Sequence, residues 1–396
     1  MRKKRNGIIF LMSVLVMLLG VLYWVKSDPK DVITHKPPSE VSPIPEDDEE
    51  EVPVERIETI TLMAVGDFLY HRPQTLKVPS EASGYDYYNN LQYVKPYLEK
   101  ADITFGNYES TSTPTREYMG YPTFNTPPES IDALKDAGFD ILNTVNNHTL
   151  DSGKQGLIDT YNNIISRDIK VVGTKVTPSE SVQVIIRNDI RVGFLGYTYG
   201  YNGLESRLNE KEHLYMGSLI EEERMERETA YSKKTNDFTI VSMHWGNEYQ
   251  IAPNDYQKKL AQKLAEWGVD VILGTHPHVI QPSQVIGDTY VIYSMGNFIS
   301  DQRLETLDKI ETERGVMLEI ELTKNFTHNE SKVGKVTPHP TWVNKYQKEG
   351  RSYYEVIPTK DYLDGTITPY TPNGSKERIQ SAHDAVYNRI TNSITE

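Results

Sequence analysis

The stretch that decides the fold is Val271-Ile-Leu-Gly-Thr-His-Pro-His-Val279, in which an apolar run ends at a glycine and two histidines follow. A short apolar run bounded by Gly and Pro is typical of a buried strand. The chain has only 10 histidines in 396 residues, so a pair around one proline indicates a shared site. On an extended backbone His276 and His278 would face the same way, because strand side chains alternate with a period of two.

Four other stretches have the same design, an apolar strand that stops abruptly at polar side chains able to bind a metal. They are MAVGDFLYHR (63–72), ITFGNYES (103–110), NTVNNHTLDSG (143–153) and VSMHWGNEY (241–249). Imidazole nitrogen and carboxylate oxygen suit divalent Mn, Fe or Zn, and the chain contains no cysteine to supply a thiolate. We therefore expect these strand ends to share a site for one or two divalent metal ions.

Each of these residues also has a structural interpretation when it is taken alone. A single histidine at a strand end is commonly a hydrogen-bonded structural residue. Asp67 follows a glycine and suits a turn or a helix N-cap, and Asp151 or Ser152 suits the N-cap of the next helix. YSMGNF (293–298) either supports the back wall of the site or faces a substrate. No phosphate-binding loop and no nucleophile elbow is present.

Expected strands alternate with expected helices in the first half of the chain and cluster in the second half. This pattern predicts an α/β sandwich of two packed sheets with helices outside. The expected helices are 89–100, 128–137, 153–166, 219–233, 253–267 and 375–391, and the expected strands include 59–65, 102–106, 139–145, 190–198, 237–246, 269–278, 289–298 and 315–322.

The N-terminal region predicts a membrane anchor. Residues 7–25 carry no charge and follow the basic residues of MRKKRN, so residues 1–6 are expected in the cytoplasm and the body outside. A cleaved signal peptide is the alternative. Residues 26–57 are acidic and rich in Pro, as in a disordered tether. A folded domain is expected over 58–324, with 325–396 as a C-terminal extension packed on it.

The net charge is −14, which argues against nonspecific binding of nucleic acid. The absence of cysteine excludes disulfides and cysteine nucleophiles. The chain is therefore expected to be a single-pass protein of the cell membrane with an acidic extracellular body.

Six motifs, in order, resemble the CapA/PgsA family of bacterial proteins linked to poly-γ-glutamate capsule synthesis. They are VGDFLYHR, GNYES, NNHTLDSGKQGL, HWGNEY, GTHPHVIQP and YSMGNF, and they span about residues 59–322. That family is similar to calcineurin-like metallophosphoesterases. The resemblance therefore implies a four-layer αββα sandwich, preceded by one transmembrane helix, with two metals at the strand ends.

The resemblance also implies roles for individual residues. Asp67 and His278 would bind the first metal, Glu109 would bridge, and the second metal would take Asn147, His244 and His276. His148 resembles the acid that stabilises the leaving group, and Arg72 is a candidate anion contact with a catalytic role. The sequence departs from the phosphoesterase pattern at Leu69, where a histidine is usual, and at the longer Glu109. Candidate substrate contacts are Asn107, Glu248 and Asn297.

Three functions are compatible with these features. The first is a membrane-anchored, metal-dependent, hydrolase-like protein of capsule polyglutamate synthesis or export. The second is a noncatalytic scaffold or polymer-binding subunit of a membrane synthase complex. The third is an extracellular metal-dependent phosphoesterase unrelated to capsule. Expected partners are the cytoplasmic membrane, other capsule-synthesis subunits, and an anionic polymer or phosphorylated substrate.

Overall fold

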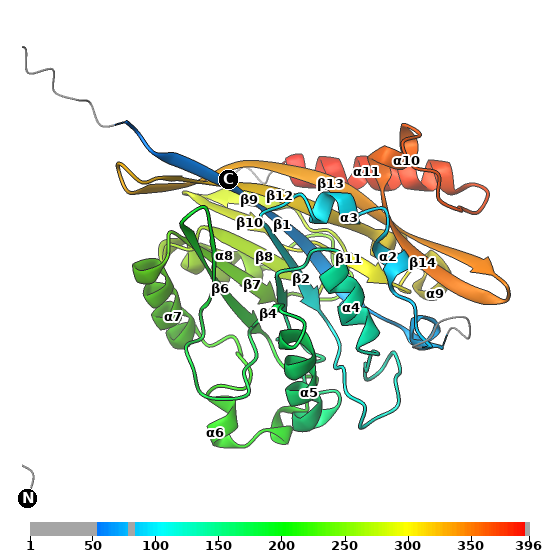
Figure 1. Ribbon diagram of the computed structural model, residues 1–396, viewed down its shortest axis with the longest axis horizontal. Helices are drawn as coiled ribbons and strands as arrows, with labels where there is room; N and C mark the ends of the chain where they lie inside the picture. The colour runs from blue at the N-terminus through cyan, green and yellow to red at the C-terminus, as the bar shows by residue number, and fades with distance from the viewer. Residues whose placement is uncertain (1–53, 78–83, 393–396) are drawn as a thin grey trace, which may run out of the picture. The chain divides into compact units, whose positions relative to one another are not determined.

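Two β-sheets pack face to face in the folded part of the chain, with helices on their outer faces (Figure 1). The computed structural model describes residues 54–77 and 84–392. The predicted anchor at 7–25 and most of the predicted tether lie outside the described residues. Within those two ranges, none of the helices combines the length and the apolar character that a membrane span requires.

The first sheet has eight strands, in the order β14-β13-β12-β1-β2-β3-β4, with β11 paired to β1 off this path. Strands β1 to β4 are mutually parallel, so their carboxyl ends lie at one edge. The strands are β1 Ile57–Leu69, β2 Ile103–Tyr108, β3 Ile141–Asn143, β4 Lys170–Val172, β11 Asn297–Ser300, β12 Arg314–Asn325, β13 Glu330–Lys348 and β14 Arg351–Pro358.

The second sheet has six strands, in the order β5-β6-β7-β8-β10-β9. Its four inner strands are parallel, and the two edge strands are antiparallel to their neighbours. The strands are β5 Gln183–Arg187, β6 Ile190–Thr198, β7 Phe238–His244, β8 Val271–Thr275, β9 Ser283–Ile286 and β10 Thr289–Ile292.

Ten α-helices and three 3₁₀-helices complete the described ranges 54–77 and 84–392. They are η1 Arg72–Thr75, α2 Tyr88–Leu91, α3 Lys95–Leu98, α4 Glu129–Asp136, α5 Gly153–Ile165, η2 Glu205–Arg207, α6 Glu210–His213, α7 Glu222–Thr235, α8 Asp255–Glu266, α9 Leu304–Leu307, η3 Ile310–Glu313, α10 Thr359–Leu363 and α11 Ser375–Thr391.

The core has three main apolar layers, one between the two sheets and one on the outer face of each sheet. Between the sheets, Phe105 of β2 stacks on Phe194 of β6 with ring centroids 6.2 Å apart. Residues of α2 to α5 pack on the outer face of the first sheet, and residues of α7 and α8 pack on that of the second. The predicted α/β sandwich is therefore confirmed, with helices on both outer faces.

The segment predicted as a C-terminal extension contributes to this sandwich. Strands β13 and β14 are hydrogen-bonded members of the first sheet. Helix α11 covers the inner face of these strands, where Trp342 packs with Ile379. Beside the second sheet, the Ser283 hydroxyl donates to the Ile390 carbonyl at 2.6 Å. The C-terminal end of α11 thus contacts edge strand β9 of the second sheet.

Two expected elements are each divided in the structure. The helix expected at 89–100 is divided into α2 and α3, because Pro96 stands at the start of α3 and interrupts the preceding hydrogen bonds. The strand expected at 289–298 is also divided: β10 belongs to the second sheet and β11 to the first. Gly296 has a φ of +64°, which lets the chain turn between the sheets.

Gly66 allows the site-bearing end of β1 to approach this turn. The Asp67 amide donates to the Gly296 carbonyl at 3.0 Å, and a Cβ on Gly66 would lie 1.9 Å from that oxygen. We expect Gly66→Ala to lower the free energy of unfolding by about 1–3 kcal/mol in urea denaturation. Gly334→Ala, on an exposed stretch of the same sheet, should lower it less, because its Cβ would lie 3.1 Å from the Glu321 side chain rather than 1.9 Å from a backbone oxygen. Equal effects would contradict the close approach.

Candidate metal centre

The polar ends of β1, β2, β7 and β8 meet where the two sheets adjoin. Among the described residues, three overlapping groups of side chains could hold a metal ion. In each group the ligand atoms lie within 4.8 Å of one another. The groups are Glu109 with His244 and His276, Asp67 with Glu109 and His278, and Glu248 with His276 and His278.

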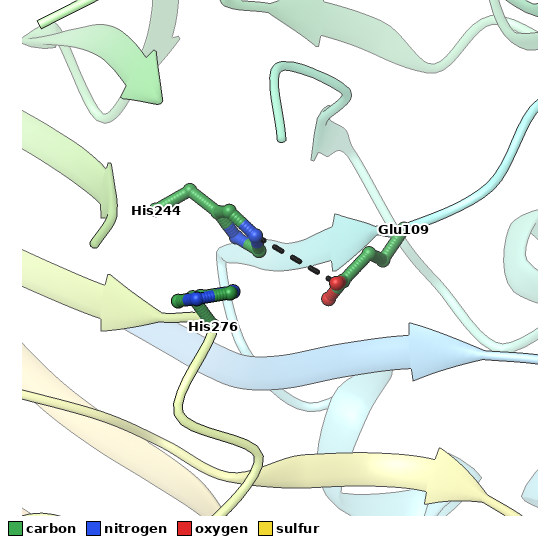
Figure 2. A group of neighbouring side chains, drawn as sticks. All are labelled: Glu109, His244 and His276. Atoms are coloured by element: carbon green, nitrogen blue, oxygen red, sulfur yellow. Dashed lines mark ion pairs between the residues drawn. The ribbon is translucent and has the colours of Figure 1, made fainter. Parts of the chain in front are cut away.

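The first group brings two imidazoles and one carboxylate together (Figure 2). His244 Nε2 lies 3.6 Å from Glu109 Oε1 and 2.9 Å from Asn147 Oδ1. The rings of His244 and His276 have centroids 4.8 Å apart. Glu109 Oε1 and His276 Nδ1 are buried and have no hydrogen-bond partner among the described residues. Such orphaned atoms are uncommon in protein interiors, and a cation would satisfy both.

Thr275 sets the orientation of the His244 ring. His244 Nδ1 lies 2.9 Å from Thr275 Oγ1, and that hydroxyl lies 3.5 Å from the Met243 carbonyl, which can only accept. This arrangement assigns the hydrogen to Nδ1, which donates to Thr275. The lone pair of Nε2 then faces the oxygens of Glu109 and Asn147. Three converging electron-pair donors are the arrangement that a divalent cation requires.

In the second group, hydrogen bonds orient the His278 ring in a similar way. His278 Nδ1 lies 3.2 Å from Asp67 Oδ2 and 3.0 Å from Asn297 Oδ1. The Asn297 amide nitrogen donates to Gln302 Oε1 and to the Thr312 carbonyl, which fixes the amide orientation. Nδ1 therefore carries the hydrogen and donates to these oxygens. The free Nε2 lies 3.8 Å from Glu109 Oε1, so the two groups share Glu109.

Asn107 bridges the two buried carboxylates of Asp67 and Glu109 by hydrogen bonds. Its Nδ2 donates to Asp67 Oδ1 at 2.8 Å and to Glu109 Oε2 at 3.3 Å. Its Oδ1 accepts from Asn143 Nδ2 at 2.8 Å. Asn107 and Asn297 are both fully buried, so neither can be the substrate contact that was predicted. Both position ligands instead.

The electrostatics of the cluster favour a bound cation. Burial raises the pKa of Glu109 well above its ordinary value, and the Asp67 and Glu248 carboxylates add to this effect. Burial also lowers the pKa of His244 well below its ordinary value and that of His276 to about 3. Neutral imidazole is the form that binds metals. The donor set therefore fits one or two divalent ions, with Glu109 between the positions.

The loop that carries the two histidines is not extended. Strand β8 ends at Thr275, and His276 and His278 have φ values of +94° and +58°. The expectation of an extended backbone is therefore wrong, although ring nitrogens of the two histidines lie within 4.8 Å of each other. The backbone curls around Pro277, and the two rings come to lie with centroids 6.0 Å apart. Non-glycine residues in this left-handed region are strained by about 1–3 kcal/mol each, and such strain concentrates at functional sites.

A cavity of about 740 Å³ opens beside the cluster. His148 lies in its wall, with Nδ1 2.8 Å from Asp151 Oδ2 and its ring against Phe124 at a centroid distance of 4.6 Å. Asp151 is not the N-cap of α5, a position taken by Ser152. Its carboxylate instead binds His148 and accepts from the Phe124 amide at 2.5 Å. Other wall residues are His71, Asn147, Glu248, Tyr249 and His278.

Arg72 does not join the cluster. Its guanidinium donates to the Tyr118 carbonyl at 2.7 Å and lies 3.1 Å from Glu117. Its side chain is about half exposed and lines a neighbouring hollow with Glu117 and Tyr118. The structure thus gives Arg72 no contact that would support the predicted catalytic role.

Comparisons with known proteins identify the family of this chain. The profile of the family described as "Bacterial capsule synthesis protein PGA_cap" matches residues 61–302. The chain belongs to this family. The resemblance inferred from the six motifs is confirmed.

Two curated relatives come from Bacillus. The "PGA biosynthesis protein CapA" of Bacillus subtilis (strain 168) is 33% identical over 245 residues, covering 60% of this chain and 62% of that protein. The "Capsule biosynthesis protein CapA" of Bacillus anthracis is 30% identical over 254 residues, covering 62% and 61%. The match thus spans about three fifths of each relative.

Solved structures show a more distant likeness. A putative 5′-nucleotidase from Staphylococcus aureus is 12% identical, with a TM-score of 0.44 over 83% of this chain and 58% of that one. A phosphatase from Mycoplasma pneumoniae is 17% identical, with a TM-score of 0.43 over 72% and 94%.

The roles of several residues at the candidate metal centre were not predicted from the sequence. Thr275 orients His244, and a hydroxyl in such a place has no signal of its own in one sequence. Asp151 was predicted as an N-cap candidate, and its role in orienting His148 was not predicted. Tyr199 contacts the His276 ring with centroids 4.6 Å apart. It directly follows β6, so the strand-end criterion that found the other residues could have found it.

The central place of Asn107 can be tested by changing its amide to an acid. Asn107→Asp puts a third carboxylate against Asp67 and Glu109 and removes the donor between them. We expect it to lower the free energy of unfolding by at least about 1–3 kcal/mol in urea with chelator present. Added Mn²⁺ should restore part of this loss. Asn388→Asp, on exposed α11, serves as the control; a loss no larger than that of the control would argue against this account.

Proposed function

We propose that this chain is a membrane-anchored, extracytoplasmic CapA-like protein that takes part in poly-γ-glutamate capsule synthesis or export through a hydrolase-like metal centre. The observation that carries this proposal is the sharing of Glu109 by two ligand groups. Membership of the PGA_cap family supports the capsule role, and the uncharged run at 7–25 after a basic N-terminus supports the anchor.

Each ligand group would hold one divalent ion, Mn, Fe or Zn. Asp67, Glu109 and His278 would form one position, and the other would take the ligands Glu109, Asn147, His244 and His276. A divalent cation bound there supplies Lewis acidity for attack on an ester, an acyl phosphate or an amide-like bond. The substrate would be an anionic polymer or a phosphorylated compound that enters the cavity.

His148 is suited to proton transfer at this centre. Its Nδ1 donates to Asp151, and Phe124 fixes the plane of the ring. When the ring is protonated, Nε2 is then the atom that can give a proton to a departing group. A positioned acid of this kind typically contributes about 10²–10⁴-fold to a rate.

A noncatalytic scaffold or polymer-binding subunit is the second candidate. It is favoured by Leu69, which offers no ligand where the phosphoesterase pattern has a histidine, and by Arg72, whose guanidinium is engaged by Glu117. In this role the metal would dock carboxylates of the polymer or have a structural function. Other membrane subunits of capsule synthesis would be its partners.

Metal binding can be measured through stability. Purified full-length chain, freed of metal with a chelator, should gain about 2.7 kcal/mol in unfolding free energy when Mn²⁺ or Zn²⁺ is added at 100 times its Kd. The double variant His276→Ala/His278→Ala should lose this gain. His328→Ala, at an exposed histidine of the β12–β13 turn, should keep it. The same loss in both variants would mean that metal acts elsewhere.

Catalysis and scaffolding differ in what His148→Ala does. We expect His148→Ala to keep metal-dependent stabilisation and to lose about 10²–10⁴-fold in hydrolysis of ester or γ-glutamyl amide substrates. In a capsule-forming Bacillus that lacks its own CapA, wild-type chain should restore capsule and His148→Ala should not. Full restoration by His148→Ala, with metal bound and no hydrolysis by either protein, would favour the scaffold.

A further inference from the structure

The two possible metal positions are unequally supplied with ligands. The position of His244 and His276 has four ligand residues when Glu109 and Asn147 are counted. In the group of Asp67, Glu109 and His278, the other position has three ligand residues. Divalent ions such as Zn²⁺ take at least four ligands. One further protein ligand could therefore bind at the His278 position.

Glu248 is placed to be that ligand. A carboxylate oxygen of Glu248 and ring nitrogens of His276 and His278 all lie within 4.8 Å of one another. Glu109 approaches the histidines from the fully buried side, whereas Glu248 is exposed and lies in the wall of the cavity. The histidines thus have a carboxylate on the buried side and another on the cavity side. His276 Nδ1, buried without a hydrogen-bond partner among the described residues, independently indicates a cation beside these histidines.

The backbone next to Glu248 is fixed in an unfavourable conformation. Tyr249 has a φ of +65°, and its amide donates to the Pro277 carbonyl at 2.8 Å. Pro277 lies between the two histidines, so this bond ties the Glu248 loop to the His-Pro-His loop. The Tyr249 hydroxyl also accepts from Gln302 Nε2 at 3.3 Å. The loop is therefore held against the cluster from two sides.

Backbone strain concentrates at this junction. Tyr249, His276 and His278 are all non-glycine residues with positive φ, and they meet within one small region. Each costs about 1–3 kcal/mol, so the surrounding contacts must overcome several kcal/mol to hold them. An ordinary surface carboxylate needs no such arrangement. A functional reason for this strain would be that the conformation directs the Glu248 side chain toward His276 and His278.

We propose that Glu248 is a metal ligand that completes the His278 position from the cavity side. This assignment replaces the substrate contact predicted for Glu248 from the sequence, and it rests on the metal centre of the proposed function. Because the carboxylate is exposed, it differs from Glu109 in being able to leave the site without burying a charge. The ion at the His278 position would therefore have one exchangeable ligand that faces the substrate cavity.

The probe is Co²⁺, bound to the full-length chain after chelator treatment. Isothermal titration and the visible absorption spectrum of bound Co²⁺ report affinity, stoichiometry and ligand geometry. We expect Glu248→Gln to weaken one equivalent of Co²⁺ by at least about tenfold and to change its spectrum. Glu248→Asp, which keeps the charge but shortens the side chain, should give an intermediate affinity. Glu226→Gln, which removes the same charge from an exposed position on α7, should match wild type.

The outcomes separate this proposal from the proposed function. If Glu248→Gln binds two equivalents with wild-type affinity and spectrum, Glu248 is not a ligand and the metal centre stands without it. If wild type binds no Co²⁺, the metal centre itself is refuted, and Glu248 with it. Urea unfolding of the metal-free proteins checks folding, and we expect equal midpoints because the Glu248 side chain is exposed.

Discussion

The structure of the site depends on one buried carboxylate. Glu109 is fully buried, has one oxygen without a hydrogen-bond partner among the described residues, and receives only a 3.3 Å bond from Asn107 on the other. An ionised carboxylate in such surroundings is costly unless a cation compensates it. The histidines around it are pushed toward their neutral forms by the same burial. Each of these features is unfavourable alone, and a divalent ion between them would satisfy all of them.

The sandwich brings these groups together because its two sheets contribute different ligands to one place. In the first sheet, Asp67 lies in β1 and Glu109 directly follows β2. In the second sheet, His244 ends β7 and His276 directly follows β8. The turn from β10 to β11 crosses between the sheets and places Asn297 against His278. The close approach of Gly66 to Gly296 holds this crossing in place. Packing of the core between the sheets therefore fixes the distances between the candidate metal ligands. Substitutions in that core would change these distances.

The strand ends were predictable because each one has a strong local signal, an apolar run followed by a ligand-type side chain. Parallel strands align their carboxyl ends, so such residues converge whatever the loops between them do. This local signal did not predict the backbone conformation of the loop that follows β8. His276 and His278 are in left-handed conformations, and neither their spacing nor Pro277 reveals this. The prediction of a catalytic role for Arg72 failed for another reason. Its partners Glu117 and Tyr118 come from a loop whose course depends on tertiary contacts.

The sequence by itself determined the α/β sandwich, the family and the set of candidate ligands, because these depend on periodicity and on residue types at strand ends. The tertiary structure alone decided which ligands share an ion position and which residues only orient them. Thr275 and Asn107 act through hydrogen bonds to residues 31 and 40 positions away in the chain, and Asp151 joins His148 to the Phe124 amide 27 positions away. The place of Glu248 depends on the bond from the Tyr249 amide to Pro277. Contacts of this kind have no periodicity, so they emerge only when the chain has folded.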